Sequence, residues 1–232
     1  MALKILSDID VDPTGYRRFW LYGKTLHPIL NDVLSIANKP VILAHKDDIK
    51  SLAQTKATVA EYAEYTDIGD FIQYLGETEH DVVIVYNLLH IKRVADVYVR
   101  MLTRSDSYDT DMIRSLDYGE WETLKKLMAD ALSDMATLAD TFVVISEEQV
   151  RIGDSSSEVN AIGPSISDGL KNEITHIFPE VFRVTYIMDK GERKLTYRTQ
   201  GTSNTYAKDE SLVLNNIETS FKEILDKISQ MG

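Results

Sequence analysis

Two kinds of hydrophobic pattern alternate along the chain. Short apolar runs, typical of strands buried on both faces of a parallel sheet, lie at residues 39–45, 80–91 and 141–148. An aromatic run predicts a first strand at residues 16–22. Apolar residues at helical spacing predict helices over residues 25–37, 67–77, 91–102 and 120–140. Strands that alternate with helices predict an α/β fold with a mostly parallel sheet.

The helix expected at residues 120–140 is the most clearly amphipathic one. Its apolar face comprises Trp121, Leu124, Leu127, Met128, Ala131, Leu132, Met135 and Leu138. Polar composition predicts loops at residues 103–119 and 151–169. After them we expect a short helix at residues 170–178, a hairpin at residues 181–201 that turns at Asp189-Lys190-Gly191, and a closing helix at residues 211–229.

Composition limits the classes of protein to consider. The chain has 232 residues and no cysteine, which excludes disulfides, thiolate metal sites and a cysteine nucleophile. We find no signal-peptide pattern and no apolar run near the roughly 20 residues that span a bilayer, so we expect a soluble, intracellular protein. The net charge of −12 disfavours a free-standing nucleic-acid binder. We expect an irregular lead-in at residues 1–15 and a single domain over residues 16–232.

Gly23-Lys24-Thr25 stands where the first strand meets the first helix. A phosphate-binding loop reads Gly, four residues, Gly, Lys, then Ser or Thr, and its backbone N–H groups curl around the phosphates. Here Gly23 precedes Lys24 directly, so five residues of the pattern are missing. We expect Gly23 to make a tight turn, Lys24 to be solvated and Thr25 to cap the helix.

A colinear series of stretches resembles one family. The series includes "FWLYGKT", "KPVILAHKDDIKSL", "HDVVIVYNLLHI", "SLDYGEWETLKKLMADALSDMATLADTFVVISEE", "VNAIGPSISDGLKNEITHIFPEVFRVTYI" and "TYAKDES". It resembles the phage-encoded RecA-like P-loop ATPases that are associated with single-strand annealing and recombination, over roughly residues 16–212. The resemblance implies a three-layer RecA-like P-loop NTPase fold, with a mostly parallel sheet and an antiparallel C-terminal hairpin.

The resemblance also implies a nucleotide site, which this chain would keep only as a vestige. Its positions match Gly23, Lys24, Thr25, Asp47, Tyr86, Asn87, Glu147 and Lys208. The family has a Mg²⁺-binding acid at the end of the Walker-B strand, where this chain has Tyr86, a neutral phenol and a poor ligand for a hard cation. The late family segment ends in an arginine that can reach a neighbour's phosphates, but Glu210 stands there instead. Glu147 matches a polar position that often orients water.

The phosphate loop, the Walker-B acid and the late arginine of the family are all missing, and ATP hydrolysis needs them together. We therefore expect a pseudo-ATPase with no catalytic residue, metal or cofactor. We expect a structural or complex-forming phage protein that acts through self-assembly or a protein partner, in the host cytoplasm or the phage particle, without a membrane. One alternative is an accessory recombination or single-strand-annealing protein that binds single-stranded DNA or a recombination partner. A second is an ATPase that binds ATP and Mg²⁺ weakly at an atypical phosphate site, through Lys24, Thr25 and Lys208.

Other chemistry has weaker support in the sequence. No two histidines have the i, i+4 spacing of a zinc motif, and no serine-hydrolase elbow is present. His45, Asp47 and Asp48 follow an expected strand at its carboxyl end, where sites in α/β proteins gather. They form either a weak metal or polar-ligand site or a solvated loop.

Overall fold

The computed structural model describes residues 17–104, 114–152 and 159–231. Within these residues, ten strands join in one sheet, in the order β10-β8-β7-β1-β5-β4-β2-β3, with β6 paired to β5 and β9 paired to β7. The strands are β1 (Arg18–Gly23), β2 (Pro40–His45), β3 (Thr58–Tyr62), β4 (Val82–Tyr86), β5 (Thr141–Ile152), β6 (Val159–Pro164), β7 (Glu180–Asp189), β8 (Glu192–Arg198), β9 (Lys208–Asp209) and β10 (Ile217–Glu218).

The centre of the sheet is parallel. Strands β7, β1, β5, β4, β2 and β3 pair in parallel, whereas β8 joins β7 in an antiparallel hairpin whose turn is Lys190-Gly191. Residues 141–146 of β5, between β1 and β4, are all buried, as their continuous apolar pattern predicts. The mostly parallel sheet with an antiparallel C-terminal hairpin is confirmed.

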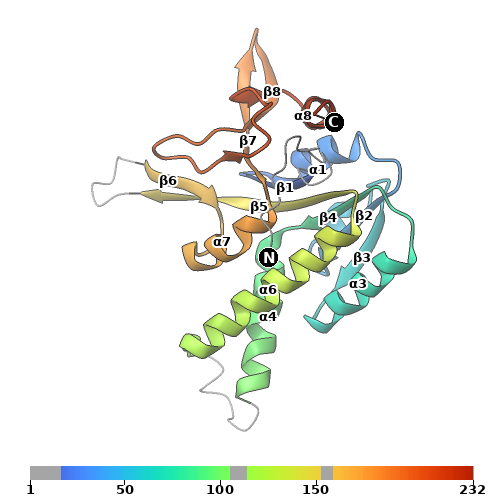
Figure 1. Ribbon diagram of the computed structural model, residues 1–232, viewed down its shortest axis with the longest axis vertical. Coiled ribbons are helices and arrows are strands. Elements are labelled where there is room, and N and C mark those ends of the chain that lie inside the picture. Colours follow the sequence, from blue (N-terminus) through green and yellow to red (C-terminus); the bar gives the residue numbers. More distant parts are fainter. Residues whose placement is uncertain (1–16, 105–113, 153–158, 232) are drawn as a thin grey trace, which may run out of the picture.

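Helices cover both faces of the sheet and make three layers (Figure 1). One face carries α1 (Leu26–Leu34), α2 (Ile49–Leu52) and α8 (Phe221–Ser229). The other carries α3 (Thr66–Glu77), α4 (Leu88–Thr103), α6 (Tyr118–Leu138), α7 (Asp168–Ile174) and a short 3-10 helix at Thr175–Ile177. Among the described residues, no helix is both long and apolar enough to cross a membrane.

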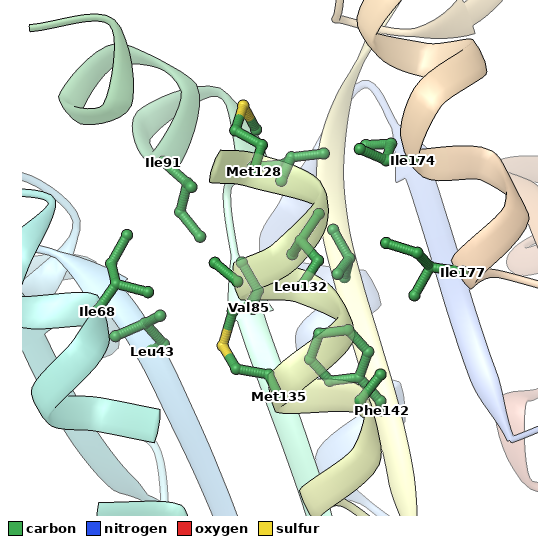
Figure 2. Close-up of a cluster of buried hydrophobic side chains, with 14 of the residues drawn as sticks. Leu43, Ile68, Val85, Ile91, Met128, Leu132, Met135, Phe142, Ile174 and Ile177 are labelled. Atoms are coloured by element: carbon green, nitrogen blue, oxygen red, sulfur yellow. The ribbon is translucent and has the colours of Figure 1, made fainter. Parts of the chain in front are cut away.

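The larger core lies between the sheet and α3, α4, α6 and α7. Figure 2 shows Met128, Leu132 and Met135 of α6 packed toward Val85 of β4 and Phe142 of β5. These five side chains are completely buried, and the 3.6-residue period of α6 places its three on one face. Leu138, which the sequence places on this face, is 39% exposed because the helix ends there.

A buried ion pair joins the end of α4 to the start of α6. Arg104 Nε donates to Glu120 Oε1 at 2.5 Å, and both side chains are 5% exposed. Asp117 and Glu120 form a capping box at the start of α6. The Arg104 guanidinium lowers the pKa of Glu120 to about 2. The pair fixes both ends of the segment that the sequence predicts as a polar loop, although residues 105–113 of that loop lie outside the described part.

Several sequence-based boundaries are wrong. The edge strand β3 and the single turn α2 were not expected, because neither has a long apolar pattern. Strand β6 falls within the expected loop at residues 151–169. The closing helix begins at Phe221 rather than near residue 211, because Leu212 has a left-handed φ of 60° and Ser220 caps the helix. The expected lead-in at residues 1–15 lies outside the described residues.

Glu180 is a buried acid at the start of β7. Its side chain is fully buried, and its Oε1 accepts a hydrogen bond from the Ser211 backbone N–H at 3.0 Å. Burial, helped by the negative charge of Asp209, raises the pKa of Glu180 from 4.5 to about 8. Folding therefore favours the protonated form of this carboxyl.

We expect Glu180 to make the protein less stable as pH rises. Because the folded pKa exceeds the unfolded one, its stabilising effect is complete below about pH 4.5 and disappears as pH rises through about 8. The loss is on the order of 3–5 kcal/mol. Urea unfolding from pH 5 to 9 should show a much flatter pH dependence for Glu180→Gln. Glu61→Gln, at an exposed position of β3, is the control. Equal slopes for Glu180→Gln and the unaltered chain would contradict this assignment.

Candidate functional site

Most of the residues proposed from the sequence lie at one edge of the sheet. Parallel strands end on the same side, so Gly23 of β1, Tyr86 of β4 and His45 of β2 end there together. In the strand register, Gly23 is opposite Glu147 of β5. We call this side, defined by the last residues of β1, β2 and β4, the carboxyl edge. It also carries Lys24, Thr25, Asp47 and Asn87, which follow those strands directly.

Lys208 does not join the others. It lies in β9 opposite Val181, which is level with Trp20 of β1, three residues before Gly23. That is about 10 Å along the strand. Its ammonium group lies 2.7 Å from a Glu210 carboxylate oxygen and donates to the Phe178 carbonyl at 3.1 Å. The structure therefore separates Lys208 from the carboxyl edge and engages its charge internally.

Gly23 is required by packing. A Cβ at this position would lie 2.6 Å from the Val184 carbonyl oxygen of β7 and 3.2 Å from the Ile29 side chain of α1. Side-chain atoms do not approach a carbonyl oxygen so closely, so only glycine fits between β1 and β7 here. The glycine that resembles part of a phosphate loop thus allows a close contact between two strands.

The junction after Gly23 is very short. Only Lys24 and Thr25 separate β1 from α1, and both side chains are exposed. Thr25 has the extended backbone of a cap residue, but its side chain makes no capping hydrogen bond, so the expected cap is wrong. Pro28 lies in the first turn of α1, where a missing N–H costs nothing. Two residues cannot supply the ring of N–H groups of a phosphate loop.

The end of β4 has no acidic side chain that could bind Mg²⁺. Tyr86 is its last residue, and Asn87 follows it. Tyr86 is 5% exposed and packs in the core beneath α1 and α2. Burial, together with the negative charge of Asp48, raises its pKa, so the phenol is neutral at pH 7. Asn87 has a left-handed φ of 66°, which asparagine tolerates, and stands at the start of α4. Its Oδ1 is buried and has no hydrogen-bond partner in the described part of the chain.

The acid of β5 that points inward next to the carboxyl edge is Glu148, which lies within the strand. Glu147 is exposed, whereas the Glu148 side chain is 2% exposed and accepts a hydrogen bond from Arg183 Nε of β7 at 2.6 Å. Sequence reasoning missed this ion pair. The alternation of a strand was the available signal, because it places Glu148 on the same face as the buried Ser146.

Asp47 belongs to a third group of side chains. His45, Asp47 and His90 each offer one ligand atom, and these three atoms lie within 4.8 Å of one another. Sequence reasoning named His45 and Asp47 but missed His90, which lies in the first turn of α4. The signal was indirect, because it required knowing that β2 pairs with β4. Burial, followed by the nearby His90, lowers the pKa of His45, so its imidazole is neutral at pH 7.

Comparison with known proteins agrees with this topology. A family model described as an AAA domain matches residues 22–211, from the end of β1 to beyond β9. The chain belongs to the AAA domain family. Its mostly parallel sheet between layers of helices is consistent with the P-loop ATPase type of fold. A search of curated proteins found no match.

The packing of this AAA domain around Gly23 predicts the effect of a methyl group there. Gly23→Ala forces Cβ against the Val184 carbonyl and should reduce the free energy of unfolding by about 1–3 kcal/mol, as overpacking does. Gly69→Ala is the matched control. Nothing lies within 4 Å of its added Cβ in α3, so it should be stabilising by about 0.5–1 kcal/mol. Urea denaturation measures both, and equal stability of the two variants would contradict the steric role of Gly23.

Proposed function

We propose that this AAA domain keeps the fold of a nucleotide-binding ATPase without hydrolysing ATP, and that it acts by assembling with other protein chains. The observation that carries the proposal is the junction of Lys24 and Thr25, which leaves two residues between β1 and α1. Phosphoryl transfer depends on positioning and charge neutralisation. A phosphate loop supplies both. The junction of Lys24 and Thr25 is too short to form such a loop.

Two further features support the same proposal. Tyr86 places a buried, neutral phenol where a Mg²⁺-binding acid would be expected. Lys208 is held by Glu210 and by backbone carbonyls, away from the carboxyl edge. Hydrolysis requires the phosphate grip, the metal ligand and the extra cation together. Loss of all three favours a fold retained for another purpose.

Assembly is favoured by the surface of α4. Val97, Met101 and Leu102 are each more than half exposed, and adjacent exposed apolar side chains often mark a protein contact. The net charge of −12 suits protein partners better than phosphates. The resemblance to phage RecA-like proteins, whose domains have faces that stack, suggests a self-assembled or complex-forming component of a phage particle or replication complex.

The first test is ATP turnover. The purified chain at high concentration should release no phosphate from Mg-ATP above the buffer rate, and Lys24→Ala should change nothing. Lys126→Ala, at an exposed position of α6, is the matched control. Mg-dependent turnover that Lys24→Ala abolishes and Lys126→Ala retains would overturn the proposal and support an ATPase with an atypical phosphate site.

The second test is the assembly state. At physiological salt, light scattering after gel filtration should show a defined oligomer, or the chain should co-purify with one stable protein partner from infected cells. Changing Val97 and Met101 together to Asp should weaken that contact at least tenfold, by placing charge on the apolar surface. Met188→Asp alters another exposed methionine, on the β7–β8 hairpin, and is the control. A monomer without a partner would contradict assembly.

One observation favours the second candidate, an accessory protein that binds single-stranded DNA. Lys24 and Arg193 line a cavity of about 380 Å³ between the start of α1 and the β7–β8 hairpin, together with Arg183, whose charge is paired with Glu148. The Arg193 guanidinium lies 3.9 Å from the ring centroid of Tyr186. Cations beside an aromatic ring suit a nucleic-acid strand. Binding of a labelled oligonucleotide that weakens steeply with salt and with Arg193→Ala would support this candidate.

A further inference from the structure

A groove of about 360 Å³ opens between α4 and the segment that follows β3. Its walls are mostly apolar and include Tyr65, Val97, Tyr98 and Met101. His45, Asp47 and His90 line the same groove, and they come from the end of β2, the turn after it and the first turn of α4. Two imidazoles and a carboxylate therefore meet beside an apolar surface.

We propose that His45, Asp47 and His90 bind a divalent transition-metal ion, with Zn²⁺ as the first candidate. Their three ligand atoms lie within 4.8 Å of one another. His45 Nδ1 and Asp47 Oδ2 are 3.3 Å apart. Tetrahedral zinc with bonds of about 2.0–2.1 Å has its ligand atoms about 3.3–3.4 Å apart. This pair already has the required spacing, and the ligand atom of His90 lies within 4.8 Å of both atoms.

The donor set selects the class of metal. Imidazole nitrogen and carboxylate oxygen are ordinary zinc ligands, and two histidines with one acid recur in catalytic zinc sites. Mg²⁺ prefers oxygen ligands and keeps several waters. The site is thus chemically distinct from the Mg²⁺ site that an ATPase would have at the end of β4.

The local contacts around His45 favour a cation. His45 Nδ1 accepts a long hydrogen bond from the Asp47 backbone N–H at 3.3 Å, so this nitrogen carries a lone pair rather than a proton. The same nitrogen lies 3.3 Å from Asp47 Oδ2. An imidazole nitrogen has one lone pair, so a metal ion at Nδ1 would replace the contact with the backbone N–H and would offset the charge of the Asp47 carboxylate.

Asp48 fits the role of an outer-shell partner that positions His90. Its Oδ2 is buried, has no hydrogen-bond partner within the described residues, and lies 3.8 Å from His90 Nδ1. Carboxylates commonly accept the other ring N–H of a metal-bound histidine and fix its orientation. The ring of His45 also makes edge-to-face contacts with two other rings. The ring centroids are 5.3 Å apart for Tyr62 and 4.7 Å apart for His90. The ligands are therefore partly preorganised.

Three protein ligands leave one position of a tetrahedral ion open. Because all three ligand residues line the groove, that position faces it. Water, or a nitrogen or oxygen donor of a molecule bound in the groove, would complete the coordination. Open zinc sites of this kind bind and polarise such donors, whereas structural sites have four protein ligands.

Calorimetric titration of the full chain with Zn²⁺ tests the proposal. We expect one saturable site, with affinity reduced more than about 100-fold in His45→Ala and in His90→Ala, and about 10–100-fold in Asp48→Asn. His176→Ala removes an exposed histidine outside the cluster and should bind like the unaltered chain. Mg²⁺ should not compete. Circular dichroism without metal shows whether each variant is folded.

A second readout does not depend on the variants. Co²⁺ added to the unaltered chain should give the visible absorption bands of a tetrahedral nitrogen–oxygen site, and Zn²⁺ should remove them. Absence of a saturable Zn²⁺ site would overturn the proposal. So would binding that His45→Ala and His90→Ala leave unchanged. If His45→Ala does not fold, His90→Ala and the Co²⁺ spectrum of the unaltered chain decide the question.

Discussion

The close contact between β1 and β7 at Gly23 determines the shape of the carboxyl edge. Gly23 lies against the Val184 carbonyl of β7 on one side and pairs with β5 on the other, and Ile29 of α1 packs against it. The chain leaves the sheet at this point and enters α1 two residues later. Backbone and side chains thus pack closely around Gly23, and the two-residue junction holds the start of α1 beside the end of β1.

A buried acid near this edge has its own cation. Arg183 pairs with Glu148, whose side chain is 2% exposed. A buried carboxylate is stable only when its charge is paired, so releasing Arg183 for a phosphate would leave Glu148 without a partner. Away from the edge, Lys208 pairs with the exposed Glu210. This internal pairing gives additional support to the proposal of a scaffold rather than a catalyst. It is independent of the short junction, since the groups concerned come from later parts of the chain.

The sequence predicted the parallel core well and the periphery poorly. Strands β2 and β4 and the first half of β5 are buried on both faces, so their apolar runs identified them without knowledge of the fold. Strand β3 lies at the edge of the sheet with polar residues exposed, so it has no continuous apolar run. Strand β6 forms by pairing with β5, and its composition does not reveal that pairing. At the candidate site, Glu148 and His90 were missed because each acts through a residue of another strand or helix. Pairings of that kind come from the order of strands in the sheet.

Asp48 links the two parts of the carboxyl edge. Its negative charge helps to raise the pKa of Tyr86, and its Oδ2 lies 3.8 Å from His90 Nδ1. A cation held by His45, Asp47 and His90 would offset the negative charge of Asp48. His90 is in the first turn of α4, which follows β4. The proposed metal would then lie in the groove rather than at the end of β4, where Tyr86 fills the core. Its imidazole and carboxylate donors suit a transition-metal ion, whereas Mg²⁺ prefers oxygen ligands.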